Sequence, residues 1–130
     1  MKTLSINYSI LQNGLNKKFS SVLLCNSVLT LSFLDVLFRE GVIRNYKLLP
    51  ELDKIEVFLK YHRGFPVITK IKSISKSGCS IYYNLEDISH WKSLYCSMNA
   101  FLVVSTSKTV FSSNELKEYK VGGQVLCTIS

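Results

Sequence analysis

The chain has 130 residues, of which 47% are hydrophobic, and its 16 Lys and Arg against 9 Asp and Glu give a net charge of +7. A chain of this length and apolar content can bury a core, which excludes a disordered basic tail. No apolar run approaches the ~18 residues of a membrane-spanning helix. The positive charge favours phosphate backbones or anionic surfaces as partners, although a merely basic soluble domain has the same composition.

The cysteines indicate thiols rather than a metal site. They are Cys25, Cys79, Cys96 and Cys127. None belongs to a Cys-x-x-Cys pair or has a histidine at ligand spacing, so the sequence predicts no zinc site. Cys25 and Cys127 lie in apolar runs, where a free cysteine behaves as a small buried hydrophobe. We therefore predict buried thiols, with no metal, no disulfide and no cofactor.

The first half of the chain predicts two helices against a small sheet. Apolar residues recur every three or four positions from Leu4 to Leu15, which predicts a helix from Lys2 to about Lys17. A short buried strand follows at 22–25.

A second helix is expected after this strand. Asn26 or Ser27 can cap its start and Gly41 can end it. Its inward face is expected to consist of Leu31, Leu34, Leu37 and Phe38.

Two strands complete the first half. Val42 to Leu48 is strand-like, 49–51 forms a turn, and apolar and polar residues alternate from Ile55 to Tyr61, which is typical of a half-buried strand. The segment Arg63-Gly64-Phe65-Pro66 is expected to end this half, because Gly and Pro interrupt ladders and helices.

The second half predicts a mostly β structure with one modest helix. It is expected to begin with extended chain at 67–75, a turn at Ser77-Gly78, a strand at 80–82 and a helix from Asn84 or Asp87 to about Tyr95. Strands are then expected at 101–106 and 109–111. A helical turn capped by Ser112 or Ser113, with Glu115 near its start, precedes a closing strand at 124–129. The predicted fold class is therefore α/β of the α+β kind. It has two small subdomains, an N-terminal α-β-α-β-β subdomain at 1–66 and a C-terminal β-rich one at 67–130.

Three hydroxyl side chains and one ammonium group directly follow the apolar run 101–104. They belong to Ser105, Thr106, Ser107 and Lys108. These groups can bond phosphate oxygens, ribose hydroxyls and base edges. A hydrolase would need a Gly-x-Ser-x-Gly elbow and a triad, and the sequence has neither. The alternative is a Ser/Thr turn that merely terminates the strand.

The block Val-Val-Ser-Thr-Ser-Lys at 103–108, followed by Val-Gly-Gly-Gln-Val-Leu-Cys at 121–127, resembles the C-terminal signature of the small-subunit ribosomal protein family called "S-eight". The resemblance runs from about Tyr8 to Ser130 and is diagnostic mainly over 101–130. It implies a non-enzymatic protein that binds the central domain of small-subunit rRNA beside neighbouring ribosomal proteins. In that family the 105–108 loop contacts the minor groove of an rRNA stem, and the next residue is usually Gly where this chain has Thr109.

The resemblance implies further RNA contacts at Lys76, Tyr82 and Gln124. Lys76 would meet a phosphate, and Tyr82 would stack on a sugar or base, unless Tyr82 belongs to the core. Gln124 stands where the family usually has an acidic residue, and its amide can bond a base edge or ribose. The preceding Gly122-Gly123 pair is expected to provide positive φ for a tight turn.

Lys17 and Lys18 are the candidate contacts of the first half. The family's first helix carries Arg-Asn-Gly where this chain has Gln12-Asn13-Gly14, so the two lysines can supply the missing positive charge. The alternative is an ordinary solvated face. Two other functions stay open: a free RNA-binding regulator of translation, and a small hydrolase or transferase.

The N-terminus lacks the features of a targeting segment, so we expect a protein that is cytosolic or made inside its own organelle. Alanine occurs once and proline twice, and the chain is rich in Ser, Leu, Ile, Phe, Tyr, Asn and Lys. AT-rich coding produces this bias. It favours an organelle-encoded mitochondrial protein, with a plastid or the bacterial cytoplasm as alternatives.

Overall fold

The computed structural model describes residues 2–74, 81–84, 86, 90, 100–106, 109–113, 115 and 122–129. The chain forms two compact units, Met1–Thr69 and Lys70–Ser130. The first unit contains α1 (Lys2–Asn16), β1 (Ser21–Cys25), α2 (Val28–Arg39), β2 (Ile43–Leu49), β3 (Lys54–Leu59), β4 (Tyr61–His62) and β5 (Phe65–Pro66). The second contains β6 (Ile71–Ser73), β7 (Tyr82–Tyr83), β8 (Phe101–Ser105), β9 (Val110–Ser112) and β10 (Gly123–Ile129).

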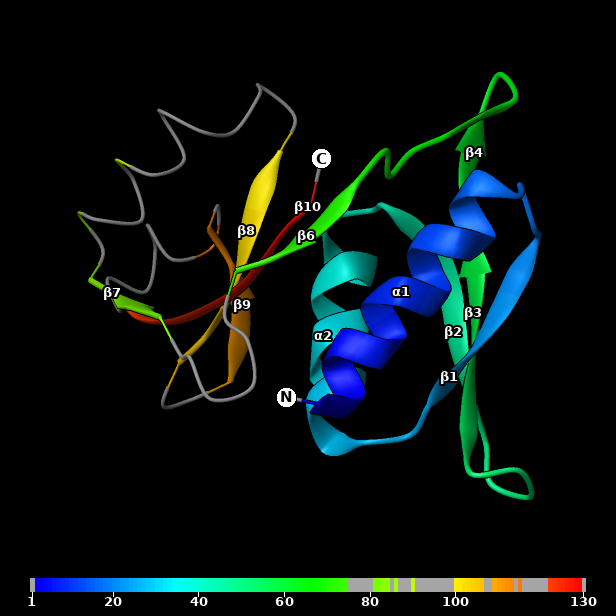
Figure 1. Ribbon diagram of the computed structural model, residues 1–130, viewed down its shortest axis with the longest axis horizontal. Helices are drawn as coiled ribbons and strands as arrows, with labels where there is room; N and C mark the ends of the chain where they lie inside the picture. The colour runs from blue at the N-terminus through cyan, green and yellow to red at the C-terminus, as the bar shows by residue number, and fades with distance from the viewer. Residues whose placement is uncertain are drawn as a thin grey trace. The chain divides into compact units, whose positions relative to one another are not determined.

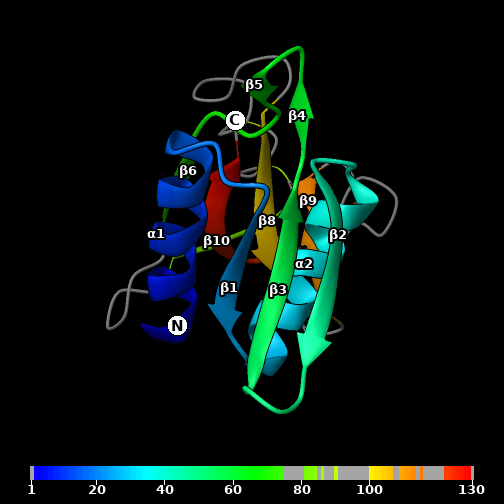
Figure 2. The same cartoon turned by 90° about the vertical axis from the view of Figure 1, so that its right-hand side faces the viewer.

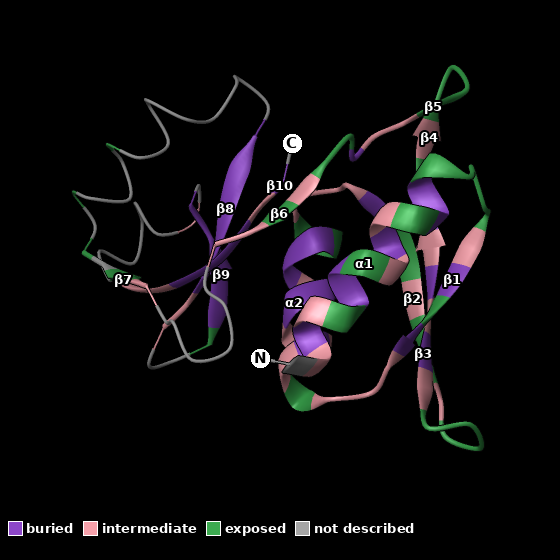
Figure 3. Cartoon of the chain, viewed as in Figure 1, coloured by how far each residue is buried: buried purple, intermediate pink, exposed green. Residues whose placement is uncertain are grey.

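The first unit is a three-stranded antiparallel sheet, in the order β1-β3-β2, with both helices on one face (Figures 1 and 2). Burial alternates along β3 as the sequence predicts, with Ile55, Val57 and Leu59 facing the helices. Figure 3 shows buried positions alternating with exposed ones along α1, and several buried positions along α2. The predicted order of two helices and three strands is confirmed.

The inward face of α2 differs from the prediction at two positions. Phe38 is 47% exposed and Leu31 is only half-buried, whereas Phe33 and Val36 are fully buried. The rotation of α2 about its own axis decides which residues face the sheet. Apolar residues occur on too many sides of this helix for the sequence to indicate that rotation. The Phe38 ring instead lies edge-on to Tyr46, with 6.5 Å between ring centroids.

Both helices close with the same C-terminal motif, in which a residue of positive φ is followed by an amide that bonds back to the last turn. After α2 this residue is Gly41, as predicted, with φ 75°, and the next amide donates to the Leu37 carbonyl at 3.1 Å. After α1 it is Lys18, with φ 58°, and the next amide donates to the Gly14 carbonyl at 2.9 Å. A lysine thus stands where glycine is usual.

The segment that was expected to interrupt the ladder is itself a hairpin. Tyr61 pairs with Pro66, and His62 pairs with Phe65. The two residues between these strands have φ values of 52° and 81°, the conformation of a tight two-residue hairpin turn. Gly64 therefore closes a ladder rather than breaking one.

The second unit is a sheet built around β10. This strand pairs with β8 on one side and with both β6 and β7 on the other, and β9 pairs with the far side of β8. The apolar run 101–104 is buried in full, as are Val125, Cys127 and Ile129. The prediction of a mixed α+β fold is confirmed. The predicted turn at Ser77-Gly78 and most of the predicted 84–95 helix lie outside the described residues.

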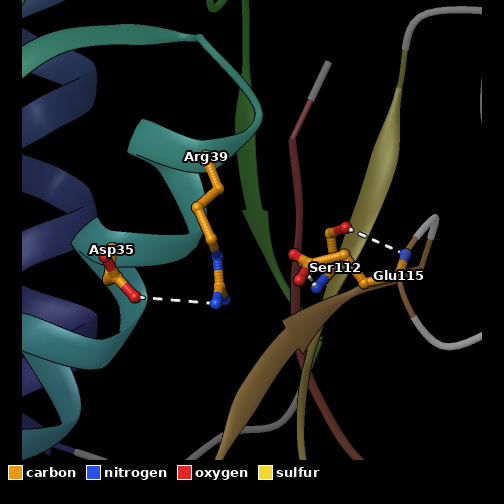
Figure 4. A network of polar contacts seen from close by, with 4 residues as sticks. All are labelled: Asp35, Arg39, Ser112 and Glu115. Atoms are coloured by element: carbon orange, nitrogen blue, oxygen red, sulfur yellow. Dashed lines mark hydrogen bonds and ion pairs between the residues drawn. The ribbon is translucent and has the colours of Figure 1, made fainter. Parts of the chain in front are cut away.

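The predicted cap after β9 is present. The Glu115 amide donates to the Ser112 hydroxyl, and the Ser112 amide donates to the Glu115 carboxylate, both at 3.4 Å (Figure 4). These reciprocal bonds form a capping box. Figure 4 also shows, within the first unit, the ion pair of Arg39 with Asp35 at 3.7 Å on successive turns of α2.

The two described cysteines differ in burial. Cys127 is buried, as predicted, but Cys25 is only half-buried, because its side chain lies toward the outer face of the sheet, where the Lys54 Nζ is 3.6 Å from its sulfur. Cys79 and Cys96 lie outside the described residues. No cluster of His, Cys, Asp or Glu within the described ranges could hold a metal ion. In the same part of the chain, no helix is long and apolar enough to cross a membrane.

Candidate nucleic-acid interface

Three candidate residues form one row across the second sheet. Gln124 of β10 lies opposite Ser105 of β8 on one side and opposite Tyr82 of β7 on the other. Residues directly opposite one another in antiparallel strands point to the same face, with Cβ atoms about 5 Å apart. The sheet therefore presents an aromatic ring, an amide and a hydroxyl side by side, although the three residues come from separate segments.

The exposure of this row matches a binding surface. Tyr82 is 68% exposed, which overturns the alternative that this ring belongs to the core. Ser105 and Gln124 are half-buried. A half-buried donor has a defined orientation and still reaches solvent, and an exposed tyrosine ring is available for stacking.

Thr106 and Thr109, at the two ends of the β8–β9 connection, are joined by three hydrogen bonds. The Thr106 hydroxyl donates to the Thr109 carbonyl at 2.7 Å and accepts from the Thr109 amide at 3.3 Å. The Thr106 amide donates to the same carbonyl at 2.8 Å. These bonds form the Ser/Thr turn that the sequence offered as the alternative, and they use the proton of the Thr106 hydroxyl and one of its two acceptor lone pairs. Ser107 and Lys108 lie outside the described residues, as does Lys76.

Gly123 is needed for close packing, and the prediction of positive φ at this residue is wrong. Its φ does not lie in the left-handed region. A Cβ added at Gly123 would instead overlap the carbonyl oxygen of Ser105. The missing side chain thus lets β10 lie against β8 where the row is formed. Strand pairing creates this requirement, so the local sequence could not indicate it.

Lys17 and Lys18 belong to the other unit. Both are exposed, at the end of α1. The Nζ of Lys18 lies over the ring of Phe65, 5.9 Å from its centroid. The candidate residues are thus divided between the two units, and sequence reasoning did not select Phe65. Its signal was weak, an aromatic residue within a long segment that lacks acidic residues.

The chemistry of the row suits binding rather than reaction. Tyr82, Gln124 and Ser105 can donate and accept hydrogen bonds or stack on a flat ring. The row contains no carboxylate and no imidazole that could activate the Ser105 hydroxyl. A surface of this kind recognises sugar hydroxyls, base edges and exposed bases, which are the groups that structured RNA presents.

Comparison with known proteins agrees with this class. Residues 4–130 match the family model described as Ribosomal protein S8. Relatives named "Small ribosomal subunit protein uS8" include one from Paramagnetospirillum magneticum, 34% identical over 122 residues, which covers 92% of this chain and 89% of that protein. The relative from Mesorhizobium japonicum is 36% identical over 123 residues, with 92% and 89% covered. That from Hyphomonas neptunium is 40% identical over 101 residues, with 74% and 72% covered.

The mixed α+β fold, the net charge of +7 and the polar row on one sheet agree with the class of structural RNA-binding proteins, and the family match assigns the chain to it. The chain is a member of the ribosomal protein S8 family. This family consists of ribosomal proteins and not of enzymes.

Proposed function

We propose that this protein is a structural component of the small ribosomal subunit, where it binds small-subunit rRNA and organises its central domain beside neighbouring ribosomal proteins. The family and the names of the relatives support this function. The observation that carries it is the row of Tyr82, Gln124 and Ser105, because these side chains suit ribose, base edges and exposed bases.

Within this proposal the residues have separate roles. Ser105, Thr106 and Gln124 bond ribose hydroxyls or base edges, and Tyr82 stacks. Thr106 also joins the two ends of the β8–β9 connection through Thr109. Lys76, Ser107 and Lys108 lie outside the described residues, so their assignment to RNA rests on the sequence alone. The C-terminal subdomain, 67–130, is the principal rRNA-binding part.

The first experiment measures association with the ribosome. Tagged protein is expressed in its own organism, lysates are separated on a sucrose gradient, and the small-subunit fractions are probed. We expect the protein to co-sediment with the small subunit. A free RNA-binding regulator of translation would instead appear in light fractions with messenger RNA, and that result would reject a structural role.

A second experiment tests the row. Tyr82→Ala should weaken binding to small-subunit rRNA about tenfold, since stacking on an aromatic ring contributes ~1–3 kcal/mol per base. Gln124→Ala should have a smaller effect of the same sign. Val28→Ala is the matched control, because Val28 is an apolar side chain with 83% exposure in the other unit. Equal affinities for all three variants would remove the row from the interface.

We further propose that the protein is encoded in the mitochondrial genome and works in the matrix ribosome. The amino-acid bias supports this location, with one alanine and two prolines in 130 residues. Immunoblots of protease-treated mitochondria should detect the protein. Detection only in plastids, or in the cytoplasm of a bacterium, would assign it to one of the alternatives.

A further inference from the structure

At one end of the first unit, α1 ends beside the β4–β5 hairpin (Figures 1 and 2). Cationic and aromatic side chains of both segments are exposed there. The Tyr61 hydroxyl donates to the Phe19 carbonyl, and the Leu59 amide donates to the Ser20 carbonyl at 3.0 Å. These bonds hold the two segments together. The side chains that they present form the hairpin patch, which we define as Lys17, Lys18, Phe19, Arg63 and Phe65.

The patch exposes two large rings among three cations. Phe65 is 71% exposed and Phe19 is 50% exposed. Lys17, Lys18 and Arg63 are also exposed, and the Lys18 ammonium lies 5.9 Å from the centroid of the Phe65 ring. Phe19 also lines a shallow groove of about 370 Å³ between α1 and β1. Phe19 and Phe65 come from the two segments that the Tyr61–Phe19 bond joins, and exposed apolar rings rimmed by polar groups indicate a surface with a partner.

The excess of positive charge around the patch favours an anionic partner. The chain has no Asp or Glu in residues 1–34 or 57–85, which include both segments of the patch. The nearest acidic residue along β3 is Glu56, and the strand register places it opposite Leu23 and Lys47 rather than beside the hairpin. The cations of the patch are therefore not neutralised by acidic neighbours from these segments.

Two of these cations occupy backbone positions that favour glycine. The described non-glycine residues with positive φ are Lys18, Asp53 and Arg63. Lys18 ends α1 at the position that Gly41 fills after α2, and Arg63 is the first residue of a turn that favours Asn or Gly. A non-glycine residue with positive φ has a strained backbone. The presence of Lys18 and Arg63 at such positions therefore indicates that their side chains have a function.

A purely structural account explains only part of the patch. Lysines in the last turn of a helix interact favourably with its dipole, which accounts for Lys17 and Lys18. This account does not extend to Arg63, which is in a hairpin turn, or to the exposed rings of Phe19 and Phe65. A partner with both negative charge and flat apolar rings explains all five residues together.

We propose that the hairpin patch is a second RNA-binding site, which holds an unpaired nucleotide of the rRNA. Its base stacks on Phe65, and the phosphates on either side meet Lys18 and Arg63. Unpaired bases are required, since paired bases inside a stem do not offer a face for stacking. This inference rests on the proposed function and adds a contact in the unit that does not contain the row.

Lys18→Gly separates the RNA-binding role from the structural one. Glycine suits φ 58° without strain, so the urea midpoint of unfolding should rise. Affinity for small-subunit rRNA should nevertheless fall about fivefold, and the slope of log affinity against log salt should decrease by about one. Lys47→Gln, an equal change of charge at an exposed lysine opposite Glu56, should weaken binding less than twofold. A more stable Lys18→Gly protein that binds rRNA like the wild type would overturn the inference.

The kind of partner is tested at position 65. Phe65→Ala should weaken rRNA binding about tenfold, and a photo-crosslinking amino acid at position 65 should label rRNA in the assembled small subunit. The same crosslinker at Val28 is the control. Crosslinks from position 65 to a neighbouring protein would overturn the inference.

These experiments distinguish rejection of the second RNA-binding site from rejection of the proposed function. If Tyr82→Ala weakens rRNA binding while Lys18→Gly and Phe65→Ala do not, the proposed function stands and the second site is rejected. If the wild-type protein itself does not bind small-subunit rRNA, the proposed function is overturned, and the second site with it.

Discussion

At the scale of single residues, two glycines set how closely neighbouring segments approach. A Cβ at Gly14 would overlap the Val22 side chain of β1, and a Cβ at Gly123 would overlap the Ser105 carbonyl oxygen of β8. The first obstacle is a side chain that can adjust, whereas the second is backbone within a sheet. Gly123 is therefore the less replaceable of the two.

We expect Gly123→Ala to destabilise the protein by about 2 kcal/mol or more, because the added methyl group must push β10 away from β8. Urea unfolding followed by circular dichroism measures this change. Gly41→Ala is the matched control: it has positive φ but no atom within 4 Å of the added Cβ, and should cost about 1 kcal/mol. A Gly123→Ala protein as stable as the wild type would contradict the predicted overlap.

Asn7 is a fully buried polar residue that joins three elements. Its amide nitrogen donates to Thr30 Oγ1 at 2.8 Å and to the Cys25 carbonyl at 3.2 Å, and its oxygen accepts from the Cys25 amide at 2.9 Å. Asn7→Ala should cost about 2–3 kcal/mol, since it leaves buried partners unsatisfied. Ser9→Ala, at an exposed position of the same helix, should change the urea midpoint little. Similar midpoints for both variants would show that the network contributes little.

At the scale of elements, the ends of helices and strands depend on single side chains. Ser27 begins α2, and the Ser112–Glu115 pair caps the turn after β9. These signals are local, so both were predictable from sequence. The β4–β5 hairpin has a local turn of its own, but its place beside α1 depends on a tertiary contact, the bond from the Tyr61 hydroxyl to the Phe19 carbonyl.

Ser27→Ala should lower the free energy of unfolding by about 1 kcal/mol, the usual loss when an N-cap is removed. The variant loses the 3.1 Å bond from the Thr30 amide to the Ser27 hydroxyl and the 2.7 Å bond that this hydroxyl donates to Thr30 Oγ1. Ser27→Asp should restore most of the stability, because a carboxylate caps as well and interacts favourably with the helix dipole. If the aspartate variant is no better than the alanine variant, the cap is not the cause. Thermal and urea unfolding both report this difference.

The Tyr61 side chain is expected to make the folded protein less stable at high pH. Burial raises the pKa of Tyr61 above its ordinary value of 10.0, so the folded state favours the neutral phenol. The stabilisation is complete below the pKa of the unfolded chain and is lost as pH rises above about 10, where the phenolate can no longer donate to the Phe19 carbonyl.

The urea midpoint should therefore fall between pH 9.5 and 11, and it should fall less in Tyr61→Phe. Part of the fall should remain in this variant, because burial, together with the Asp35 carboxylate, also raises the pKa of Tyr46. Identical pH profiles for both proteins would mean that Tyr61 does not contribute.

At the scale of the whole molecule, binding combines long-range charge with short-range geometry. The net charge of +7 attracts any RNA, whereas the row on the second sheet has hydroxyl, amide and aromatic groups and no charge of its own. Salt screens the first contribution strongly and the second weakly. The two contributions can therefore be separated by varying the salt concentration.

We expect the protein to prefer a structured small-subunit rRNA stem over single-stranded RNA of equal length by ~100-fold or more, as is usual for specific binding. Raising salt from ~50 to ~200 mM should weaken binding to both RNAs, while their ratio is retained or increases. Filter binding or fluorescence titration measures both affinities. Equal affinity for the two RNAs at ~150 mM salt would show that charge alone drives binding.

The sequence by itself determined the order of elements in the first half, the helix end at Gly41 and the polar chemistry of residues 105–108. It also narrowed the two caps to Asn26 or Ser27 and to Ser112 or Ser113. These features depend on neighbours within a few positions along the chain, so periodicity and capping rules are sufficient to find them. The family was also recognisable from the C-terminal block.

Only the tertiary structure decided which of these residues lie together. The register of β7, β10 and β8 puts Tyr82, Gln124 and Ser105 in one row, and the fold of the first unit brings Lys18 to Phe65. The pairing of β10 with β8 also explains Gly123, which was expected in a turn but is needed because a side chain there would overlap β8. These outcomes depend on contacts between residues far apart in the chain, and a pattern in the sequence does not contain the register that creates them.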